Sequence, residues 1–213
     1  MALECKICGL SDVAGIDAAM RYGARMVGFN FFPKSPRYVS FDQAAALSPR
    51  VSPDVERVGV MVDPDDEMLR QAIAAGRLSI VQLHGKEDPG RVAQVKEQFA
   101  IKVMKVIRVS EATDLDEADA YVPFADLLMF DAKPPKGATR PGGNAVAFDW
   151  RILAGRTWKR PWLLSGGLDV ANVARAVEIS GTRMVDAASG IETAPGKKDP
   201  ALIKAFLEEL ASL

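Results

Sequence analysis

The sequence is poor in several features that mark common functional classes. Histidine occurs once and cysteine twice in 213 residues, so a zinc site, which usually takes four such ligands, has little to draw on. No apolar run approaches the ~18 residues that span a bilayer, and no basic segment followed by an apolar core marks a signal peptide. The expectation is a cytoplasmic protein with no membrane partner and no metal site.

An excess of charge of one sign is also missing. The 27 lysines and arginines balance 28 aspartates and glutamates, for a net charge of -1. Nucleic acids normally bind a basic face, so no nucleic-acid partner is predicted. The content of 48% hydrophobic and 26% charged residues is typical of a globular protein whose length allows a full core.

Apolar runs with strand character alternate with amphipathic segments along the chain. The predicted strands are Leu3–Cys8, Met26–Phe31, Arg57–Val62, Ile80–Leu83, Ile101–Ile107, Asp126–Phe130, Pro161–Leu164 and Met184–Ala187. The predicted helices include Asp12–Tyr22, Phe41–Leu47, Asp65–Ala75, Pro89–Phe99, Val170–Ile179 and Pro200–Leu210. Such alternation indicates parallel strands joined by crossover helices. It predicts an α/β fold, a single-domain (β/α)8 TIM barrel over residues 1–213, with a doubly wound open sheet as the competing architecture.

Polar residues and glycines follow several predicted strands. In a barrel, the carboxyl ends of the strands carry the chemistry. The candidates there are Cys8-Gly9, His84-Gly85, Asp131, Ser165-Gly166-Gly167 and Ser189-Gly190. The stretch Lys133–Asn144, rich in proline and glycine, is predicted to be a long loop rather than a linker.

The two cysteines form a C-x-x-C within the first predicted strand. Residues three apart in a strand point to opposite faces and lie about 10 Å apart, whereas a disulfide needs Cα atoms within about 7 Å. A redox or zinc motif is therefore disfavoured. Cys5 shares a face with Ile7 and Cys8 with Lys6, so one cysteine is expected to pack and the other to reach a pocket. The alternative is that both are simply buried thiols.

Motifs spread along the chain carry a more specific signal. They are KICG (6–9), PKSPRYVS (33–40), VQLHG (81–85), FDAK (130–133), PGGN (141–144), FDW (148–150), LSGGL (164–168), SGIE (189–192) and PGKKD (195–199). In this order and spacing, over residues 3 to 210, the set closely resembles the phosphoribosylanthranilate isomerase family of tryptophan biosynthesis. The resemblance implies a (β/α)8 barrel.

The resemblance also implies a reaction. The family performs an Amadori rearrangement, in which the aminoaldose N-(5'-phosphoribosyl)anthranilate becomes the aminoketose 1-(2-carboxyphenylamino)-1-deoxyribulose 5-phosphate. An acid opens the furanose ring to an iminium, and a base removes the proton from C2'. No cofactor, metal or redox partner is implied.

By resemblance, Cys8 is the general base and Asp131 the general acid. A free thiol has a pKa of about 8.5, so a nearby cation would help to supply thiolate. Lys6 is a candidate for that cation, and its alternative role is an ion pair with Asp186 lower in the barrel. The alternative for Asp131 is a carboxylate that caps a loop.

By resemblance, Arg37 binds the anthranilate carboxylate, which a guanidinium can hold through two hydrogen bonds. The alternative is a solvated loop arginine. His84 is expected to face the barrel interior with Gln82 and to position substrate, without transferring a proton. Without the resemblance, His84 would be interpreted as a core histidine with satisfied hydrogen bonds.

Two glycine-containing loops predict a phosphate site. Gly166, Gly167, Ser189 and Gly190 follow the last two strands, where barrels often bind phosphate through backbone N–H groups. Gly142-Gly143 is interpreted either as a further approach to the ligand or as a plain turn. Three positions depart from the family pattern: Ala188 replaces a usual serine, Ala145 a common glycine, and Asn30 a frequent aliphatic residue.

Two other functional classes compete with the isomerase. One is a catalytically silent phosphosugar-binding barrel or partner protein, which would have no chemical need for both Cys8 and Asp131. The other is a different phosphosugar enzyme of this fold, either indole-glycerol-phosphate synthase, which calls for a catalytic lysine–glutamate set, or a pentose-phosphate epimerase, which calls for metal-binding histidines. The single histidine excludes the epimerase. The predicted partner is a small phosphosugar substrate, and a monomer with one function is the simplest expectation.

Overall fold

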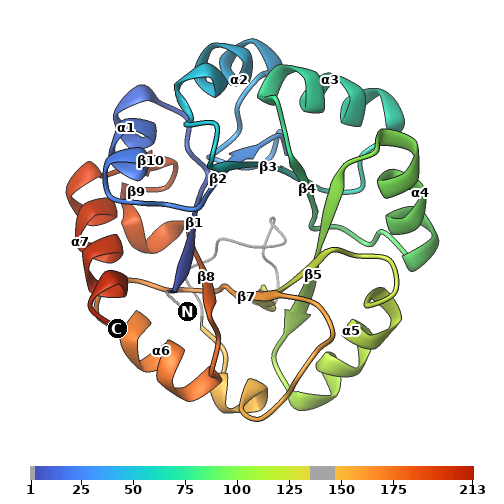
Figure 1. The fold of residues 1–213 in the computed structure, drawn as a ribbon, viewed down its shortest axis with the longest axis vertical. Helices are drawn as coiled ribbons and strands as arrows, with labels where there is room; N and C mark the ends of the chain where they lie inside the picture. The colour runs from blue at the N-terminus through green and yellow to red at the C-terminus, as the bar shows by residue number, and fades with distance from the viewer. Residues whose placement is uncertain (1–2, 135–146) are drawn as a thin grey trace.

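A closed parallel barrel forms the centre of the molecule (Figure 1). The computed structural model describes residues 3–134 and 147–213. The barrel strands are β1 Glu4–Cys8, β2 Met26–Asn30, β3 Glu56–Met61, β4 Ile80–Leu83, β5 Lys102–Val109, β6 Leu127–Ala132, β7 Trp162–Leu164 and β8 Met184–Ala187. Their order around the barrel follows the chain, and β8 pairs with β1. The predicted barrel is confirmed, and the doubly wound sheet is wrong.

Helices surround the barrel in the same order (Figure 1). They are α1 Val13–Arg21, α2 Phe41–Leu47, α3 Asp66–Gly76, α4 Pro89–Phe99, α5 Asp116–Tyr121, α6 Val173–Ser180 and α7 Pro200–Ala211. Short 3-10 helices are η1 Ser48–Arg50, η2 Ala112–Leu115, η3 Trp150–Leu153 and η4 Ser189–Ile191, and β9 Glu192–Ala194 and β10 Lys197–Lys198 form a small antiparallel hairpin. The sequence predictions did not include α5 or this hairpin. Of the predicted loop at Lys133–Asn144, the residues Gly142 and Gly143 lie outside the described part, as does Ala145.

Two apolar layers hold the barrel together. One fills the inside with side chains from alternate strand positions, namely Met26, Val58, Ile80, Met104, Val106, Leu127, Met129 and Leu163. The other lies between the strands and the helices and includes Ile7, Phe29 and Phe206, each with no more than 1% of its surface exposed. Because side chains alternate along a strand, each strand contributes to both layers. The inner layer is a floor for whatever lies nearer the strand ends.

The ends of the helices follow local chemical signals. Asp88 and Asp199 each accept backbone N–H bonds at the start of α4 and α7, and a proline follows each of them. The aspartate side chain accepts hydrogen bonds from backbone N–H groups in the first turn that would otherwise be unpaired. Proline fits the first helical position because it has no N–H group that needs a partner. Arg77 and Ala100 end α3 and α4 with left-handed backbone angles.

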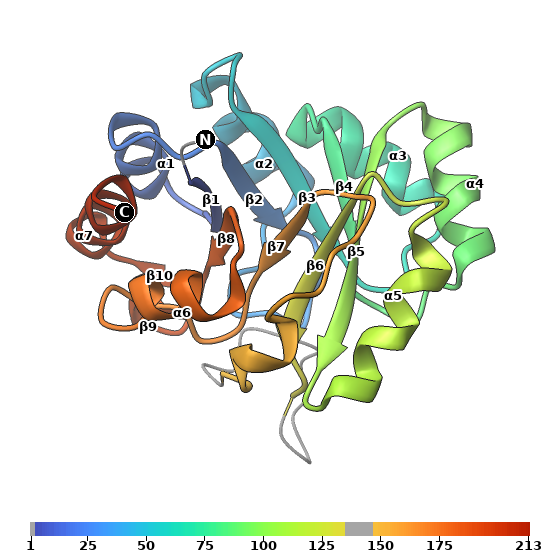
Figure 2. The same ribbon diagram turned by 60° about the horizontal axis from the view of Figure 1, so that its bottom comes forward.

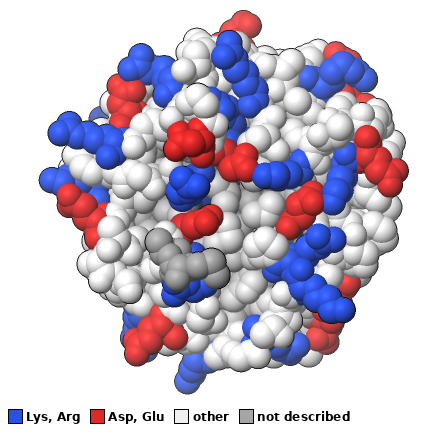
Figure 3. Space-filling model, viewed as in Figure 1, with Lys and Arg blue, Asp and Glu red and all other residues white. Residues whose placement is uncertain are grey.

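All eight barrel strands run toward one end of the molecule, which is the lower end in Figure 2. The loops that follow the strands gather there. Figure 3 looks onto the opposite, amino-terminal end, where lysine and arginine side chains are interspersed with aspartate and glutamate. Within the described ranges, no helix combines the length and apolar character needed to cross a membrane.

Candidate active site

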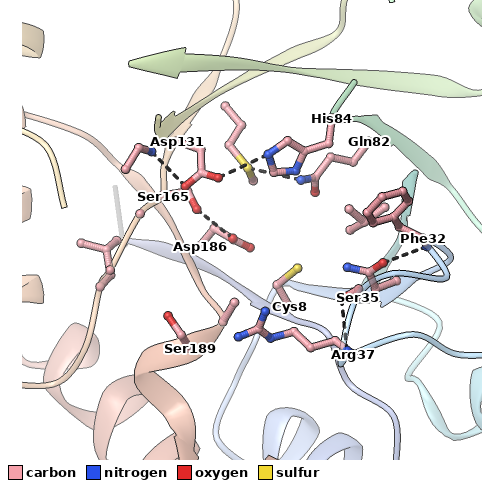
Figure 4. Close-up of a pocket in the computed structure, with 18 of the residues that line it drawn as sticks. Cys8, Phe32, Ser35, Arg37, Gln82, His84, Asp131, Ser165, Asp186 and Ser189 are labelled. Atoms are coloured by element: carbon pink, nitrogen blue, oxygen red, sulfur yellow. Dashed lines mark hydrogen bonds and ion pairs between the residues drawn. The ribbon is translucent and has the colours of Figure 1, made fainter. Parts of the chain in front are cut away.

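A pocket opens at the carboxyl ends of the strands (Figure 4). Its lining residues are Cys8, Asn30, Phe32, Ser35, Arg37, Val60, Val62, Gln82, His84, Met129, Asp131, Ala132, Lys133, Ser165, Gly166, Gly167, Leu168, Asp186, Ala188 and Ser189. Of the residues predicted to act as acid or base or to bind the carboxylate, the sugar or the phosphate, Cys8, Asp131, Arg37, His84, Gly166, Gly167 and Ser189 line this pocket and Gly190 does not. The pocket therefore collects residues that lie as much as 181 positions apart along the chain.

The two cysteines of β1 lie on opposite faces of the strand, as the parity argument predicted. Cys5 belongs to the apolar layer between strands and helices, and Cys8 lines the pocket. Both are free thiols. A Cβ atom on Gly28 would come within 3.1 Å of both Cys8 Sγ and Lys6 Nζ. The glycine of β2 thus leaves the space in which this sulfur and this ammonium group meet.

Lys6 is fully buried and forms an ion pair with Asp186, at 2.8 Å from Nζ to Oδ1. The pairing follows from the barrel register, which sets Lys6 beside Asp186 across the β1–β8 junction. Ser165 Oγ donates to the other oxygen, Oδ2, at 3.1 Å. The predicted ion pair is confirmed, and the proximity to Cys8 means that Lys6 also acts on the thiol.

These charges oppose one another at the Cys8 sulfur. Burial raises the pKa of the Cys8 thiol, Lys6 lowers it through its charge and hydrogen bonding, and Asp186 raises it again. The net direction is upward from the ordinary value. For Lys6, burial by itself would lower the pKa, but Asp186 and Cys8 raise it above the ordinary value. Lys6 therefore stays a cation, and it does most to lower the pKa of the Cys8 thiol, with a smaller contribution from the charge of Lys198.

Asp131 lies across the pocket from Cys8, beside the only histidine (Figure 4). Only 4% of its surface is exposed. Its Oδ1 accepts the backbone N–H of Ala132 at 3.0 Å, and its Oδ2 lies 3.3 Å from His84 Nε2. That second contact is too poorly aligned to be a hydrogen bond, so Nε2 has no hydrogen-bond partner among the described residues. An unpaired ring nitrogen that lines a pocket is available to a ligand.

Gln82 and His84 share the interior face of β4 and its end, as predicted. The Gln82 side chain is buried, with its amide nitrogen 3.5 Å from Met129 Sδ. Its amide oxygen has no hydrogen-bond partner within the described residues. This part of the pocket therefore presents two unpaired polar atoms over the apolar floor.

Arg37 is only 5% exposed, which rules out a solvated loop arginine. Its Nε and Nη2 atoms donate to the two carboxylate oxygens of Glu192 at 2.7 and 2.8 Å. The sequence analysis did not foresee this partner, which occupies one edge of the guanidinium group and leaves Nη1 for the pocket. A Cβ atom on Gly9 would lie 2.6 Å from Arg37 Cδ, and Gly9 has a positive φ of 74°. The glycine of the KICG motif thus makes room for the arginine.

The predicted phosphate loops lie together at one side of the pocket. Gly166 and Gly167 both have positive φ angles, and their backbone N–H groups have no acceptor among the described residues. Ser189 begins η4 and lines the same side. Gly190 instead packs against the loop that follows β7. A Cβ atom on Gly190 would lie 2.1 Å from the carbonyl oxygen of Leu168. Its role is to let the two loops touch.

The sequence analysis assigned no role to several residues around the pocket. Glu192 and Lys198 belong to the SGIE and PGKKD motifs, and both side chains are almost fully buried. Asn30 lines the pocket, and its side-chain oxygen accepts the backbone N–H of Phe32 at 2.9 Å. The acid and the base shortly after the last strand were the available signal for Glu192 and Lys198. Their pairing depends on a hairpin that strand propensity did not predict.

A second buried ion pair supports the loop that carries His84. Lys105 Nζ lies 2.7 Å from Glu87 Oε2, and each side chain is 2% exposed. Glu87 also accepts the backbone N–H groups of Asp63 and Gly85. Arg108 donates to the carbonyl oxygen of His84 at 2.6 Å. These contacts hold the end of β4 in place.

Comparison with known proteins shows the family to which the chain belongs. A family model described as N-(5'phosphoribosyl)anthranilate (PRA) isomerase matches residues 5–209. The N-(5'-phosphoribosyl)anthranilate isomerase of Paramagnetospirillum magneticum is 53% identical over 208 residues, which cover 98% of this chain and 97% of that protein. The crystal structure of phosphoribosyl anthranilate isomerase from Thermotoga maritima matches with a TM-score of 0.88 and 36% identity, covering 99% of this chain and 100% of that one.

A further solved structure carries a ligand. It is a phosphoribosyl anthranilate isomerase in complex with reduced 1-(o-carboxyphenylamino)-1-deoxyribulose 5-phosphate, and it matches with a TM-score of 0.86 and 34% identity over 99% of this chain and 100% of that one. The family match spans nearly the whole sequence, and a relative shares 53% of the aligned residues. The chain is a member of the N-(5'-phosphoribosyl)anthranilate isomerase family.

Proposed function

We propose that this protein isomerises N-(5'-phosphoribosyl)anthranilate to 1-(2-carboxyphenylamino)-1-deoxyribulose 5-phosphate, with Cys8 as general base and Asp131 as general acid. The observation that carries the proposal is that Cys8 and Asp131 face each other across one pocket (Figure 4). The rearrangement needs one acid and one base on either side of the same sugar. Candidate partners for the substrate's carboxylate and phosphate line the same pocket.

The first step opens the furanose ring. Asp131 in its protonated form gives its proton to the ring oxygen as the C1'–O bond breaks. The nitrogen lone pair forms the C1'=N bond, which makes an iminium. His84, whose Nε2 lies 3.3 Å from Asp131 Oδ2, positions the carboxyl group and the sugar without taking part in proton transfer.

The second step removes the proton from C2'. The Cys8 thiolate takes this proton, the C–H electron pair forms a C1'=C2' bond, and the nitrogen recovers its lone pair. The resulting enol then becomes the ketone as its hydroxyl proton is lost and C1' gains one. Lys6 supports the thiolate, since it lowers the pKa that burial raises. All electrons stay within the substrate, so the atoms balance without an external oxidant or reductant.

Both ends of the substrate find partners of the right charge. Arg37 offers Nη1 to the anthranilate carboxylate, in a charge-assisted hydrogen bond. The free N–H groups of Gly166 and Gly167, with Ser189, bind the phosphate. Ala188, at the position of a usual serine, removes one hydroxyl from this set, and a hydrogen bond of that kind contributes roughly 0.5–1.5 kcal/mol.

The proposal includes the setting in which the enzyme works. The two free cysteines fit a reducing cytoplasm, and a monomer stays a prediction. The barrel closes through β1 and β8, and α7 packs against α1, which supports a single domain over residues 1–213.

An assay on the fluorescent aminoaldose tests the proposed activity. The purified protein is expected to consume N-(5'-phosphoribosyl)anthranilate much faster than a sample without enzyme, and mass spectrometry and chromatography should identify the aminoketose as the product. Consumption no faster than the spontaneous rate would contradict the proposed function. An anthranilate product without aminoketose would indicate hydrolysis instead of isomerisation.

A further inference from the structure

The hairpin formed by β9 and β10 contributes two buried charges to which the mechanism assigns no contact with substrate. Glu192 begins the hairpin and Lys198 ends it. Lys198 Nζ lies 2.7 Å from Glu192 Oε1, and the two side chains are 0% and 4% exposed. Arg37, also buried, donates to both oxygens of Glu192. Burying an ion is costly unless its partners are well placed, so a set of this kind needs an explanation.

The set carries an unbalanced charge. Arg37 and Lys198 are cations and Glu192 is the single anion between them, which leaves one positive charge beside the pocket. The burial of Lys198 lowers its pKa, and the charge of Glu192 opposes that effect. Burial raises the pKa of Glu192, but Arg37 and Lys198 together bring it below its ordinary value. Glu192 is therefore ionised, and an anion bound in the pocket would complete the charge balance.

Lys198 also contacts the segment that leads into the proposed phosphate loop. Its Nζ donates to the carbonyl oxygen of Ala188 at 2.7 Å. Ala188 precedes Ser189, where the proposed phosphate loop begins. The ammonium group of Lys198 thus contacts both the proposed phosphate loop and the Glu192 carboxylate that binds Arg37.

The tip of the hairpin is pressed against the loop that carries Arg37. Gly196 has a positive φ of 84°, and a Cβ atom there would lie 2.2 Å from the carbonyl oxygen of Pro36. Only glycine fits such a close approach with this backbone angle. The hairpin is therefore fixed to the β2 loop by backbone packing as well as by charge.

We propose that Glu192 and Lys198 are positioning residues for the two anionic ends of the substrate. Glu192 holds one edge of Arg37, so that Nη1 points at the carboxylate. Lys198 fixes Glu192 and the phosphate loop at once. The proposal rests on the proposed function. We call the segment Glu192–Lys198 the brace, because it would set the distance between the carboxylate and phosphate sites.

Two ligands separate the two ends of the site in a binding experiment. The first is reduced 1-(o-carboxyphenylamino)-1-deoxyribulose 5-phosphate, the compound bound in the related structure. The second is the matching phenyl compound, which lacks the carboxylate and keeps the phosphate. The dissociation constant of the phenyl compound divided by that of the carboxyphenyl compound measures how much the carboxylate adds to binding. The dissociation constant of the phenyl compound alone measures binding at the phosphate end.

The variants are expected to differ in which end they weaken. Glu192→Gln should reduce the ratio by about tenfold, the effect of a lost charge-assisted contact, while the phenyl compound binds as in the wild type. In turnover, the same variant should raise KM more than it lowers kcat. Lys198→Met should weaken the phenyl compound as well. Asp17→Asn, in an exposed ion pair with Arg50, is the control and should change neither constant.

Glu192→Gln leaves two buried cations together and can unfold for that reason alone. The double variant Glu192→Gln with Lys198→Met removes one charge of each sign, and the same tenfold loss of the ratio is expected. A ratio within twofold of wild type in a folded variant would overturn the brace, as would equal weakening of both ligands by Glu192→Gln. If the wild type bound neither compound, the proposed function itself would be overturned.

Discussion

The two ends of the barrel differ in how deeply their ion pairs are buried. At the carboxyl end, the side chains of Lys6, Asp186, Arg37, Glu192 and Lys198 are each 5% exposed or less, and all are paired. At the amino-terminal end, seen in Figure 3, Lys102 pairs with Glu56 while 57% and 34% of these side chains stay exposed. The same residue types thus occur in two different environments.

The difference follows from the cost of burying ions. An exposed pair contributes about 0–1 kcal/mol and can be lost without harm. A buried pair is often no more stabilising than an apolar pair of the same size, yet removing one partner is costly. The fold therefore gains little from the charges at its carboxyl end. Their position around Cys8 and Arg37 fits the roles proposed for these two residues.

The largest expected effect comes from removing the proposed acid or base. Cys8→Ala and Asp131→Asn should each lower kcat by about 10²–10⁴-fold, the usual contribution of one such group. Cys5→Ala is the matched control on the same strand. It should cost about 1 kcal/mol of stability and leave kcat unchanged. Steady-state kinetics measures kcat, and thermal unfolding measures stability. Near-normal turnover by Cys8→Ala would contradict the assigned roles.

The next effect comes from breaking the Lys6–Asp186 pair. Lys6→Met should lower the free energy of unfolding by about 3–5 kcal/mol, since it leaves Asp186 buried with its main partner gone. Burial raises the pKa of Cys8 and Lys6 lowers it, whereas Asp186 raises it. The rise of kcat/KM with pH should therefore move to higher pH in Lys6→Met and to lower pH in Asp186→Asn. Shifts in the same direction would contradict this electrostatic account.

A smaller effect is expected at the glycine that accommodates the arginine. Gly9→Ala should displace the Arg37 side chain, because the new Cβ would lie 2.6 Å from its Cδ. The expected result is a KM increased by about tenfold, as for one lost charge-assisted contact, with a smaller change in kcat. Gly23→Ala is the control, since Gly23 also has a positive φ but no atom would lie within 4 Å of its Cβ. Equal KM values in the two variants would show that the position of Arg37 does not depend on Gly9.

The smallest effect is expected at the amino-terminal end. Lys102→Gln and Glu56→Gln should change the free energy of unfolding by no more than about 1 kcal/mol, because the pair is exposed and screened. Neither variant should alter kcat or KM. Urea unfolding and kinetics measure both quantities, and a loss of activity here would erase the contrast between the two ends.

Much of the fold could be predicted from the sequence. β4, β8, α2 and α4 have the predicted bounds, because each joins a clear apolar pattern to a turn or cap. Helix α5 was missed, since it has only six residues and three of them are acidic. Short elements of this kind are held by packing against neighbours rather than by their own propensity.

The site could be predicted only in part. Strand parity separated Cys5 from Cys8, and the ordered motifs supplied Arg37 and Asp131. The Glu192 carboxylate on Arg37 could not be predicted, because the contact joins residues 155 positions apart through a hairpin with weak strand signals. The packing role of Gly190 likewise depends on a contact with another loop that the local sequence does not contain.

The most direct test follows the C2' hydrogen itself. Substrate carrying deuterium at C2' is incubated with wild type, Cys8→Ala and Cys5→Ala, and the release of deuterium is measured together with product. The account predicts that wild type and Cys5→Ala release deuterium at similar rates. In Cys8→Ala the rate should be lower by a factor of about 10² or more. Release by Cys8→Ala at the wild-type rate would contradict the claim that Cys8 removes this proton.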